Sequence, residues 1–205
     1  MTLAQLRAVI RLTLANTDRW PDAGLDEWIR QAIRLYGAHF PLRSQVTIDL
    51  TPGVQQYELP VDGLVAVLSV EQPAGVAVPV KVVPPAYGDP AGYAQLVLTA
   101  PVTVPAQAVV TVAAAHPLPA ADGDALTVPP QHIEALTAYV EFAAHYELEC
   151  AEAPVLDGST IVLSQLGDEA RRAWTRYKEV MDRLAWAGQP DPYAEPYVTW
   201  GDLGL

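Results

Sequence analysis

The feature that most constrains this chain is a change in the spacing of its apolar residues, from a helical period to alternation and back again. From Ser44 to Val128 the only basic residue is Lys81, and valine recurs at alternate positions. Two helical patterns precede this stretch and two follow it. The layout predicts an α+β protein, in which helices from both ends of the chain form a bundle and the middle forms an antiparallel β-sandwich or barrel.

The first block of sequence predicts two helices. Thr2 and Gln5 have the spacing of a capping box, and Asp22 can cap the second helix, which Gly37 and Pro41 then stop. We expect a helical hairpin, since the connection between the helices is short. Apolar residues repeat at helical spacing at Leu3, Leu6, Ile10 and Leu14, and again at Leu25, Ile29, Ile33 and Tyr36.

The middle block predicts about six short strands. Pro52-Gly53 and Asp62-Gly63 supply the turns, and several prolines confine strands to edges or shorten them. The expected strands are residues 46–50, 57–59, 64–70, 76–82, 96–98 and 109–112.

Helical spacing returns after Pro129-Pro130, a position where the first turn of a helix tolerates proline. One face of this helix is Ile133, Leu136, Val140 and Ala144, and a second face is Tyr139, Phe142 and Tyr146. A helix that is apolar on two faces is packed on both sides. The last helix has a coiled-coil-like seam, supported by a Glu179–Arg183 pair. The seam residues are Leu163, Leu166, Ala170, Ala173, Tyr177, Val180 and Leu184.

These patterns divide the chain into a helical bundle domain of residues 1–43 and 129–187, a β-sandwich insertion of residues 44–128 and an extended C-terminal arm of residues 188–205. Three prolines in the arm disfavour a helix there. Tyr193, Tyr197 and Trp200 lie between or after these prolines, and such aromatic residues are typical anchors at interfaces. We expect the arm to dock on a neighbouring protein; the alternatives are a disordered terminus or an arm folded back on its own subunit.

The net charge of −12 excludes some functions. Residues 1–43 carry six arginines against four acids, and the following blocks are net negative. Tight binding of nucleic acid needs clustered Lys and Arg, which we do not find, although an acidic wall could face DNA without holding it. Charged residues make up only 18% of the chain, so we expect partner subunits to cover apolar surface.

The sequence also lacks the marks of secretion and membrane insertion. Cys150 is the single cysteine, which excludes an intrachain disulfide framework and a cysteine zinc site. Arg7 and Arg11 interrupt what would be the apolar core of a signal peptide. No apolar run approaches the roughly 20 residues of a membrane span. We therefore expect a soluble protein made in a reducing cytoplasm.

Candidate chemistry is sparse, and no catalytic residue, cofactor site or metal site is expected. Glu141, His145 and Glu149 share a helix face, for which a solvated acidic face is a better interpretation than a metal site. His132-Ile133-Glu134 matches the His-x-Glu of zinc deaminases by chance, since their Pro-Cys-x-x-Cys is absent. Asp122-Gly123-Asp124 is interpreted as a turn before a strand, and Gly158-Ser159 lacks the nucleophile-elbow pattern.

Several local sequences, taken in order, resemble one known family. They are Arg19-Trp20-Pro21-Asp22, Leu25 to Ala32, Leu50 to Pro60, His116-Pro117-Leu118, Leu126 to Pro129 and Ile133 to Val140. This order resembles that of the head-to-tail adaptor (connector) proteins of tailed bacteriophages, over roughly residues 1–185. Many such adaptors are almost entirely helical, and this chain differs in its large sheet insertion.

The resemblance implies a structural virion protein of the phage neck rather than an enzyme. It implies a ring, usually of twelve copies, that docks on the portal, passes DNA through its channel without specific binding and joins the next neck or tail protein. Assembly would take place in the host cytoplasm, without a membrane. In such adaptors an extended C-terminal arm commonly contacts the portal, so Tyr193, Tyr197 and Trp200 become contacts to the portal or to a neighbouring subunit.

Two other classes of function remain open. One is a surface- or carbohydrate-binding module of a phage tail or adhesin, built on the β-sandwich. Such a module needs exposed aromatic residues, yet the strand region contains only Tyr57, Tyr87 and Tyr93 and no tryptophan. The other is an enzyme that uses the Glu141/His145/Glu149 face, which the absence of a second motif disfavours.

Overall fold

The computed structural model describes residues 1–14, 19–72, 75–84, 93–152 and 160–187. Contacts between residues group these into two compact units. The helical unit contains residues 1–40 and 116–187 of the described chain, and the sheet unit contains residues 41–115. The predicted division into folding domains at residues 43/44 and 128/129 stays a prediction.

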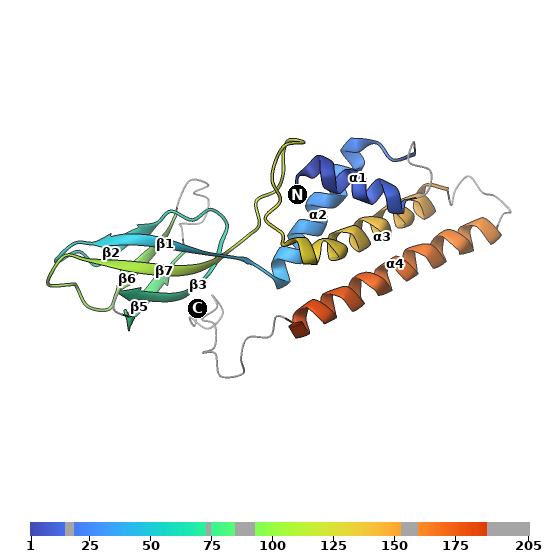
Figure 1. Cartoon of the computed structure of the whole chain (residues 1–205). Helices are drawn as coiled ribbons and strands as arrows, with labels where there is room; N and C mark the ends of the chain where they lie inside the picture. The colour runs from blue at the N-terminus through green and yellow to red at the C-terminus, as the bar shows by residue number, and fades with distance from the viewer. Residues whose placement is uncertain (15–18, 73–74, 85–92, 153–159, 188–205) are drawn as a thin grey trace. The chain divides into compact units, whose positions relative to one another are not determined.

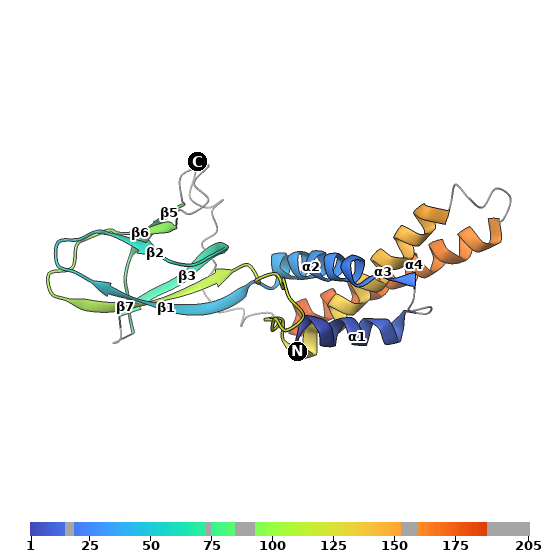
Figure 2. The ribbon, with the colours of Figure 1, turned by 90° about the horizontal axis from the view of Figure 1, so that it is seen from above.

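The helical unit is built around one central helix, α3 (Ile133–Glu152), which follows a short 3-10 turn, η2 (Pro130–His132). Helices α1 (Leu3–Thr13) and α2 (Asp22–His39) contact α3 and each other, and α4 (Thr160–Ala187) runs along α3. Figures 1 and 2 show α1 and α2 side by side on one side of α3 and α4 on the other. The prediction that α3 is packed on both sides is therefore confirmed.

The apolar stripes predicted from the sequence form the core of this unit. All eight stripe residues of α1 and α2 are buried, and so are Ile133, Leu136, Val140 and Ala144 of α3. On α4, the seam residues Ala170, Ala173, Tyr177, Val180 and Leu184 are buried as predicted. Leu163 and Leu166 belong to a part of α4 whose side chains are not described.

The helix ends partly follow the predictions. The capping box is present: the Thr2 hydroxyl accepts from the Gln5 N–H, and the Gln5 side chain accepts from the Thr2 N–H. The prediction of Asp22 as a cap is wrong, because Pro21 is the N-cap residue and Asp22 is the first residue of the helix. Gly37 does not stop α2, which continues to His39. A Cβ on Gly37 would meet Cδ2 of His116 at 3.3 Å, so the glycine serves a close approach.

The sheet unit contains two antiparallel sheets. One has the strand order β1-β7-β3-β4 and the other β2-β6-β5. The strands are β1 (Leu42–Leu50), β2 (Gln56–Leu59), β3 (Leu64–Gln72), β4 (Val76–Ala77), β5 (Val80–Val83), β6 (Ala94–Leu98) and β7 (Ala106–Ala114). Leu42 pairs with Ala114 and Leu50 with Ala106, so β1 and β7 pair along their whole length.

The single strand predicted over residues 76–82 is wrong. Pro79 divides this segment, because a proline has no N–H to donate to a ladder. Val76 and Ala77 before it pair with β3 in the first sheet, while Val80 to Val83 after it pair with β6 in the second. The chain therefore changes sheets at the proline, and about six predicted strands become seven.

Both sheets contribute to one core. Its fully buried members include Leu59 of β2, Leu96 of β6 and Val110 of β7. The α+β class is therefore confirmed, and the described strands form two separate sheets rather than a closed barrel. Within the described chain, none of the helices has both the length and the apolar character of a membrane span.

Candidate interaction surface

The contact between α3 and α4 has a polar flank. Arg183 donates to Oε2 of Glu134 at 2.6 Å, and Arg176 donates to Glu134 at 3.4 Å and to Glu141 at 3.3 Å. The hydrogen bond from Arg183, with help from Arg176, holds the pKa of Glu134 below its usual value. These pairs replace the predicted Glu179–Arg183 pair within α4, because Glu134 offers Arg183 a partner on the facing helix.

The other flank of the same contact is aromatic. The ring of Phe142 lies 4.9 Å from Trp174 and 5.8 Å from Tyr146, measured between ring centroids. Tyr177 joins this cluster, with its ring 5.3 Å from Trp174 and 5.6 Å from Tyr139. Burial raises the pKa of both Tyr139 and Tyr177. The cluster continues from the core to the surface, where Trp174 is 39% exposed and Tyr146 is 54% exposed.

The face predicted from Glu141, His145 and Glu149 meets α4. Glu141 pairs with Arg176, and Nδ1 of His145 lies 3.3 Å from Oε2 of Glu169 without the orientation of a hydrogen bond. The Glu149 carboxylate lies against Gly167, where a Cβ would meet its Oε1 at 2.8 Å. These residues are half-buried at a helix contact, so the predicted solvated face is wrong. No group of His, Cys, Asp and Glu suited to a metal ion occurs among the described residues.

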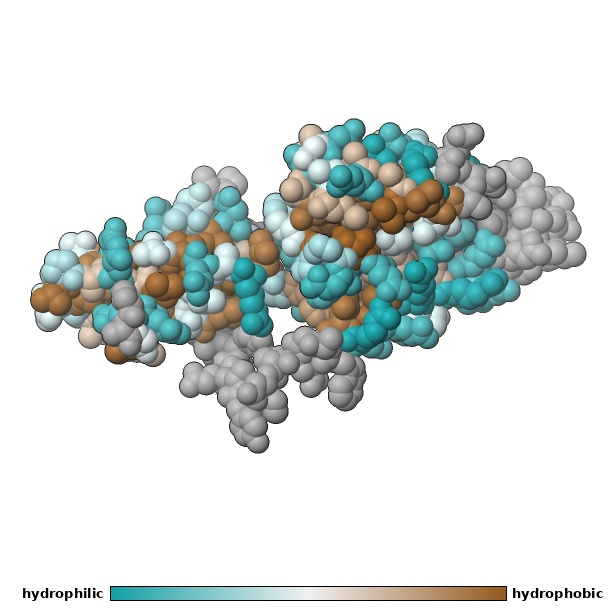
Figure 3. Space-filling view, viewed as in Figure 1, coloured by the Kyte–Doolittle hydropathy of each residue, from teal (hydrophilic) through white to brown (hydrophobic). Residues whose placement is uncertain are grey.

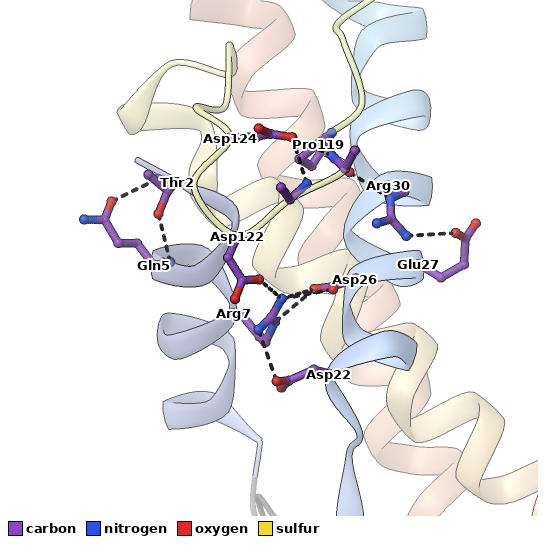
Figure 4. A network of polar contacts seen from close by, with 12 residues as sticks. Thr2, Gln5, Arg7, Asp22, Asp26, Glu27, Arg30, Pro119, Asp122 and Asp124 are labelled. Carbon is purple, nitrogen blue, oxygen red and sulfur yellow. Dashed lines mark hydrogen bonds and ion pairs between the residues drawn. The ribbon is translucent and has the colours of Figure 1, made fainter.

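A buried arginine joins three segments of the helical unit (Figure 4). The Arg7 guanidinium on α1 donates two 2.9 Å hydrogen bonds to Asp26 of α2 and one of 2.7 Å to Asp122. Asp22 completes the set at 3.2 Å. Burial lowers the pKa of Arg7, but the hydrogen bonds to Asp122 and Asp26 outweigh burial and the net change is upward. Sequence reasoning missed this network, because Asp122 is 115 positions from Arg7.

The two points where the chain leaves and re-enters the helical unit are hydrogen-bonded to each other. Nε2 of His116 lies 2.9 Å from the Phe40 carbonyl oxygen, and Nδ1 lies 2.7 Å from the Thr127 hydroxyl. A carbonyl can only accept, so Nε2 carries the proton and, in the neutral ring, Nδ1 accepts from Thr127. His116 thereby fixes the start of the re-entering segment against the end of α2.

The His132-Ile133-Glu134 triplet takes part in packing. The Tyr36 hydroxyl lies 2.5 Å from Nδ1 of His132, while Glu134 turns to the arginines of α4. Burial raises the pKa of Tyr36 to about 12 and lowers the pKa of His132. Both shifts favour a neutral pair in which the Tyr36 hydroxyl donates to the imidazole. The chance interpretation of the triplet agrees with this arrangement.

Asp122-Gly123-Asp124 forms the predicted turn. The Asp124 carboxylate accepts from the N–H groups of Ala120 and Ala121, which lowers its pKa. The predicted strand after the turn is reduced to an isolated bridge between Ala125 and Thr2. Gly158-Ser159 lies outside the described residues.

Helix α4 carries basic residues close together in the sequence, so the expectation that the chain has no cluster of Lys and Arg is wrong. Arg171, Arg172, Arg176 and Lys178 fall within eight positions that contain no acid, in a chain of net charge −12. Arg171 has a side chain that is 76% exposed and contacts Asp168 at 2.5 Å. Figure 3 shows the region of α4 as mainly hydrophilic, with apolar residues gathered over the neighbouring helices. A shallow depression beside Trp174 is lined by Phe142, Tyr146, Glu149, Gly167, Ala170 and Arg171.

The predicted contact residues Tyr193, Tyr197 and Trp200 lie outside the described residues. In the sheet unit, the Tyr57 hydroxyl is hydrogen-bonded to nearby backbone groups. It accepts from the Thr51 N–H and lies 3.1 Å from the Thr51 and Val54 carbonyl oxygens. Tyr93 is 37% exposed, and Tyr87 is not described. The described part of the sheet unit therefore offers one exposed aromatic ring, which is little for a carbohydrate platform.

The sequence model of the SU10 adaptor protein family matches residues 1–198. The match covers both helical blocks, the strand block between them and the arm as far as Val198. It therefore includes Tyr193 and Tyr197 and ends before Trp200. No curated protein matches the chain.

Proposed function

Because the chain belongs to the SU10 adaptor protein family, we propose that it forms a ring in the neck of a tailed bacteriophage, docks on the portal and joins the capsid to the tail. The resemblance to head-to-tail adaptors that the sequence predicted is confirmed by this membership, which makes the chain a structural component of a virion. The observation that carries the proposal is the extent of the match, which includes the whole helix–strand–helix order.

The ring has twelve copies in this proposal, and its channel passes DNA without holding it. The charge of the chain supports this, because a net charge of −12 disfavours the counterion release that drives tight binding to phosphates. On α4, Arg176 is paired with Glu134 and Glu141 and Arg183 with Glu134, so these two arginines face carboxylates of α3. The role of the protein is structural rather than catalytic.

The arm completes the proposal as a contact to the portal or to a neighbouring subunit, through Tyr193, Tyr197 and Trp200. Large aromatic side chains contribute much of the binding energy at protein interfaces when they become buried. Assembly takes place in the host cytoplasm, and the next neck or tail protein binds the ring after it.

The experiment mixes the purified protein with its own portal and separates the complexes by sedimentation. We expect the full-length protein to co-sediment with the portal, and a variant lacking residues 189–205 to do so more weakly with a nearly unchanged melting temperature. Failure of the full-length protein to bind the portal would contradict the proposed function. Equal binding by the truncated variant would contradict the role of the arm alone.

A further inference from the structure

We propose that the arm of one copy docks on the α3–α4 hairpin of a neighbouring copy, at a surface made by Phe142, Tyr146, Arg171, Trp174 and Lys178. We call this the aromatic–basic surface. The inference rests on the proposed function, since it assumes a ring, and it names the site that receives the arm. The aromatic flank and the basic segment described above form this surface together.

Helix geometry brings basic and aromatic residues of α4 together. Arg171, Trp174 and Lys178 stand at positions i, i+3 and i+7, which places them along one stripe of a helix. Arg171 and Trp174 line the same shallow depression as Phe142 and Tyr146 of α3. Trp174 and Lys178 are exposed, as is Tyr146. Two basic side chains therefore border a group of partly exposed aromatic rings.

The aromatic rings of this surface are held in place by one another. Trp174 contacts Phe142 and Tyr177, and Phe142 stacks on Tyr146 with an angle of 28° between the ring planes. Rings held by such contacts lose little conformational entropy when they bind. An exposed cluster of fixed aromatic rings is the kind of groove that receives an extended, proline-rich segment.

The chemistry of the arm is complementary to this surface. Residues 189–205 contain Asp191, Glu195 and Asp202 and no basic residue. The aromatic–basic surface presents Arg171 and Lys178, and among the described residues Glu149 is the one acid that lines its depression. Acidic and aromatic residues alternate at Asp191, Tyr193, Glu195 and Tyr197, and Trp200 and Asp202 follow. Arginine and lysine therefore meet carboxylates while the rings of the arm meet the rings of the surface.

The prolines of the arm favour docking on another copy. Pro190 and Pro192 favour an extended course immediately after α4, which disfavours a return along the same helix. In an extended conformation the twelve residues from 189 to 200 span about 37 Å. A ring also needs two different patches that meet head to tail, and the arm and the aromatic–basic surface supply such a pair.

The test uses the native cysteine beside the surface. Cys150 is exposed, and its thiol interacts with the Tyr146 hydroxyl. In the full-length protein, Ala194→Cys places a second thiol in the arm without removing an aromatic residue. A short bismaleimide linker should then join Cys150 of one copy to residue 194 of the next. We expect a ladder of covalent oligomers on a denaturing gel.

Two matched controls define the background of this reaction. Ala194→Cys combined with Cys150→Ser should give no ladder, because the acceptor thiol is gone. The second control keeps Cys150 and Ala194 and places the added cysteine at Val54, an exposed position of the sheet unit. This Val54→Cys protein should also give no ladder.

A charge exchange then tests recognition independently of any damage to the fold. Arg171→Glu with Lys178→Glu should lower the cross-linking yield about tenfold, and so should Asp191→Lys with Glu195→Lys. The four changes together should recover most of the yield. Recovery would support the proposal, and a failure to recover in a protein with an unchanged melting temperature would overturn it.

Other outcomes separate this inference from the proposed function. Rings that bind the portal but give no ladder would overturn the inference and leave the adaptor function standing. Cross-links confined to single chains would assign the arm to its own subunit and overturn the contact between copies. Binding of duplex DNA that depends on Arg171 and Lys178, without a ladder, would assign the surface to nucleic acid. If the protein forms no ring and does not bind the portal, the proposed function itself is wrong.

Discussion

The Arg7 network makes a sharp prediction about the stability of the helical unit. The Arg7 side chain is 10% exposed and that of Asp26 is 16% exposed, whereas those of Asp22 and Asp122 are 59% and 69% exposed. The pair with Asp26 therefore carries most of the energy, since exposed pairs contribute little. Arg7→Ala leaves the Asp26 carboxylate half-buried without either of its 2.9 Å hydrogen bonds.

Breaking a buried ion pair by removing one partner costs about 3–5 kcal/mol, and the residual exposure of Asp26 places this case near the lower end. We expect Arg7→Ala to lower the free energy of unfolding by about 3 kcal/mol, which is roughly 10 °C in melting temperature for a unit of this size. Asp26→Asn should cost less than Arg7→Ala, because Arg7 keeps Asp122 and Asp22 as partners.

The assay is urea unfolding followed by tryptophan fluorescence. The five tryptophans are residues 20, 28, 174, 186 and 200, so the sheet unit contributes none and the signal follows the helical unit and the arm. Arg34→Ala is the matched control, since it removes an arginine that is 53% exposed and pairs with the exposed Glu27. Its cost should stay below roughly 1 kcal/mol. An Arg7→Ala protein as stable as this control would refute the reasoning.

Two further predictions concern the junctions of the chain. Burial lowers the pKa of His132 from the usual 6.5, so the unfolded chain binds the proton more readily. The helical unit should therefore lose stability as the pH falls below about 6.5, and His132→Gln should reduce this loss. Urea titrations at pH 5 and pH 7 measure it, and an equal loss of stability in the wild-type and His132→Gln proteins would contradict the prediction. Gly63→Ala should destabilise the sheet unit by about 1–2 kcal/mol, because Gly63 has a φ of +61° and an added Cβ would meet Ala115 Cβ at 3.1 Å. Unfolding followed by the circular dichroism signal of the strands measures this loss. Gly53→Ala is the control, since Gly53 also has a positive φ but an added Cβ would meet nothing within 4 Å; the difference between the two variants is the cost of the contact with Ala115.

The sequence predicted the features that depend on local periodicity. The helical stripes, the capping box at Thr2 and the alternating strands follow from residues a few positions apart, and the structure has them. The arrangement of α3 between two layers also followed, because its two apolar faces each need a partner. These are cases in which burial of apolar side chains dominates the energy.

The polar contacts could not be predicted in the same way. Glu179 is the partner that spacing within α4 predicts for Arg183, yet Arg183 forms its ion pair with Glu134 of the facing helix. A partner across a packed contact is held in place by both helices. Asp22 is a plausible cap by sequence, yet Arg7 and Arg11 bind it. Each of these partners becomes available only when the helices have packed.

The sequence predicted part of the aromatic–basic surface. The aromatic face of α3 was recognised, but the sequence assigned it to packing alone, and only the structure shows that Tyr146 and Trp174 stay partly exposed at its end. Pro79 carried the signal for the change of sheets, since it removes one donor from the ladder. The sequence could not show that the chain passes from one sheet to the other at Pro79, because this requires knowing that two sheets share the core.

We propose that this chain assembles as an adaptor ring on a portal. Light scattering of the protein, alone and mixed with its own portal, with negative-stain images of both samples, tests it most directly. We predict a complex with the portal that contains a ring of the protein, and for twelve copies of the 22.1 kDa chain the ring contributes about 265 kDa. A strictly monomeric protein that does not bind the portal would contradict the account.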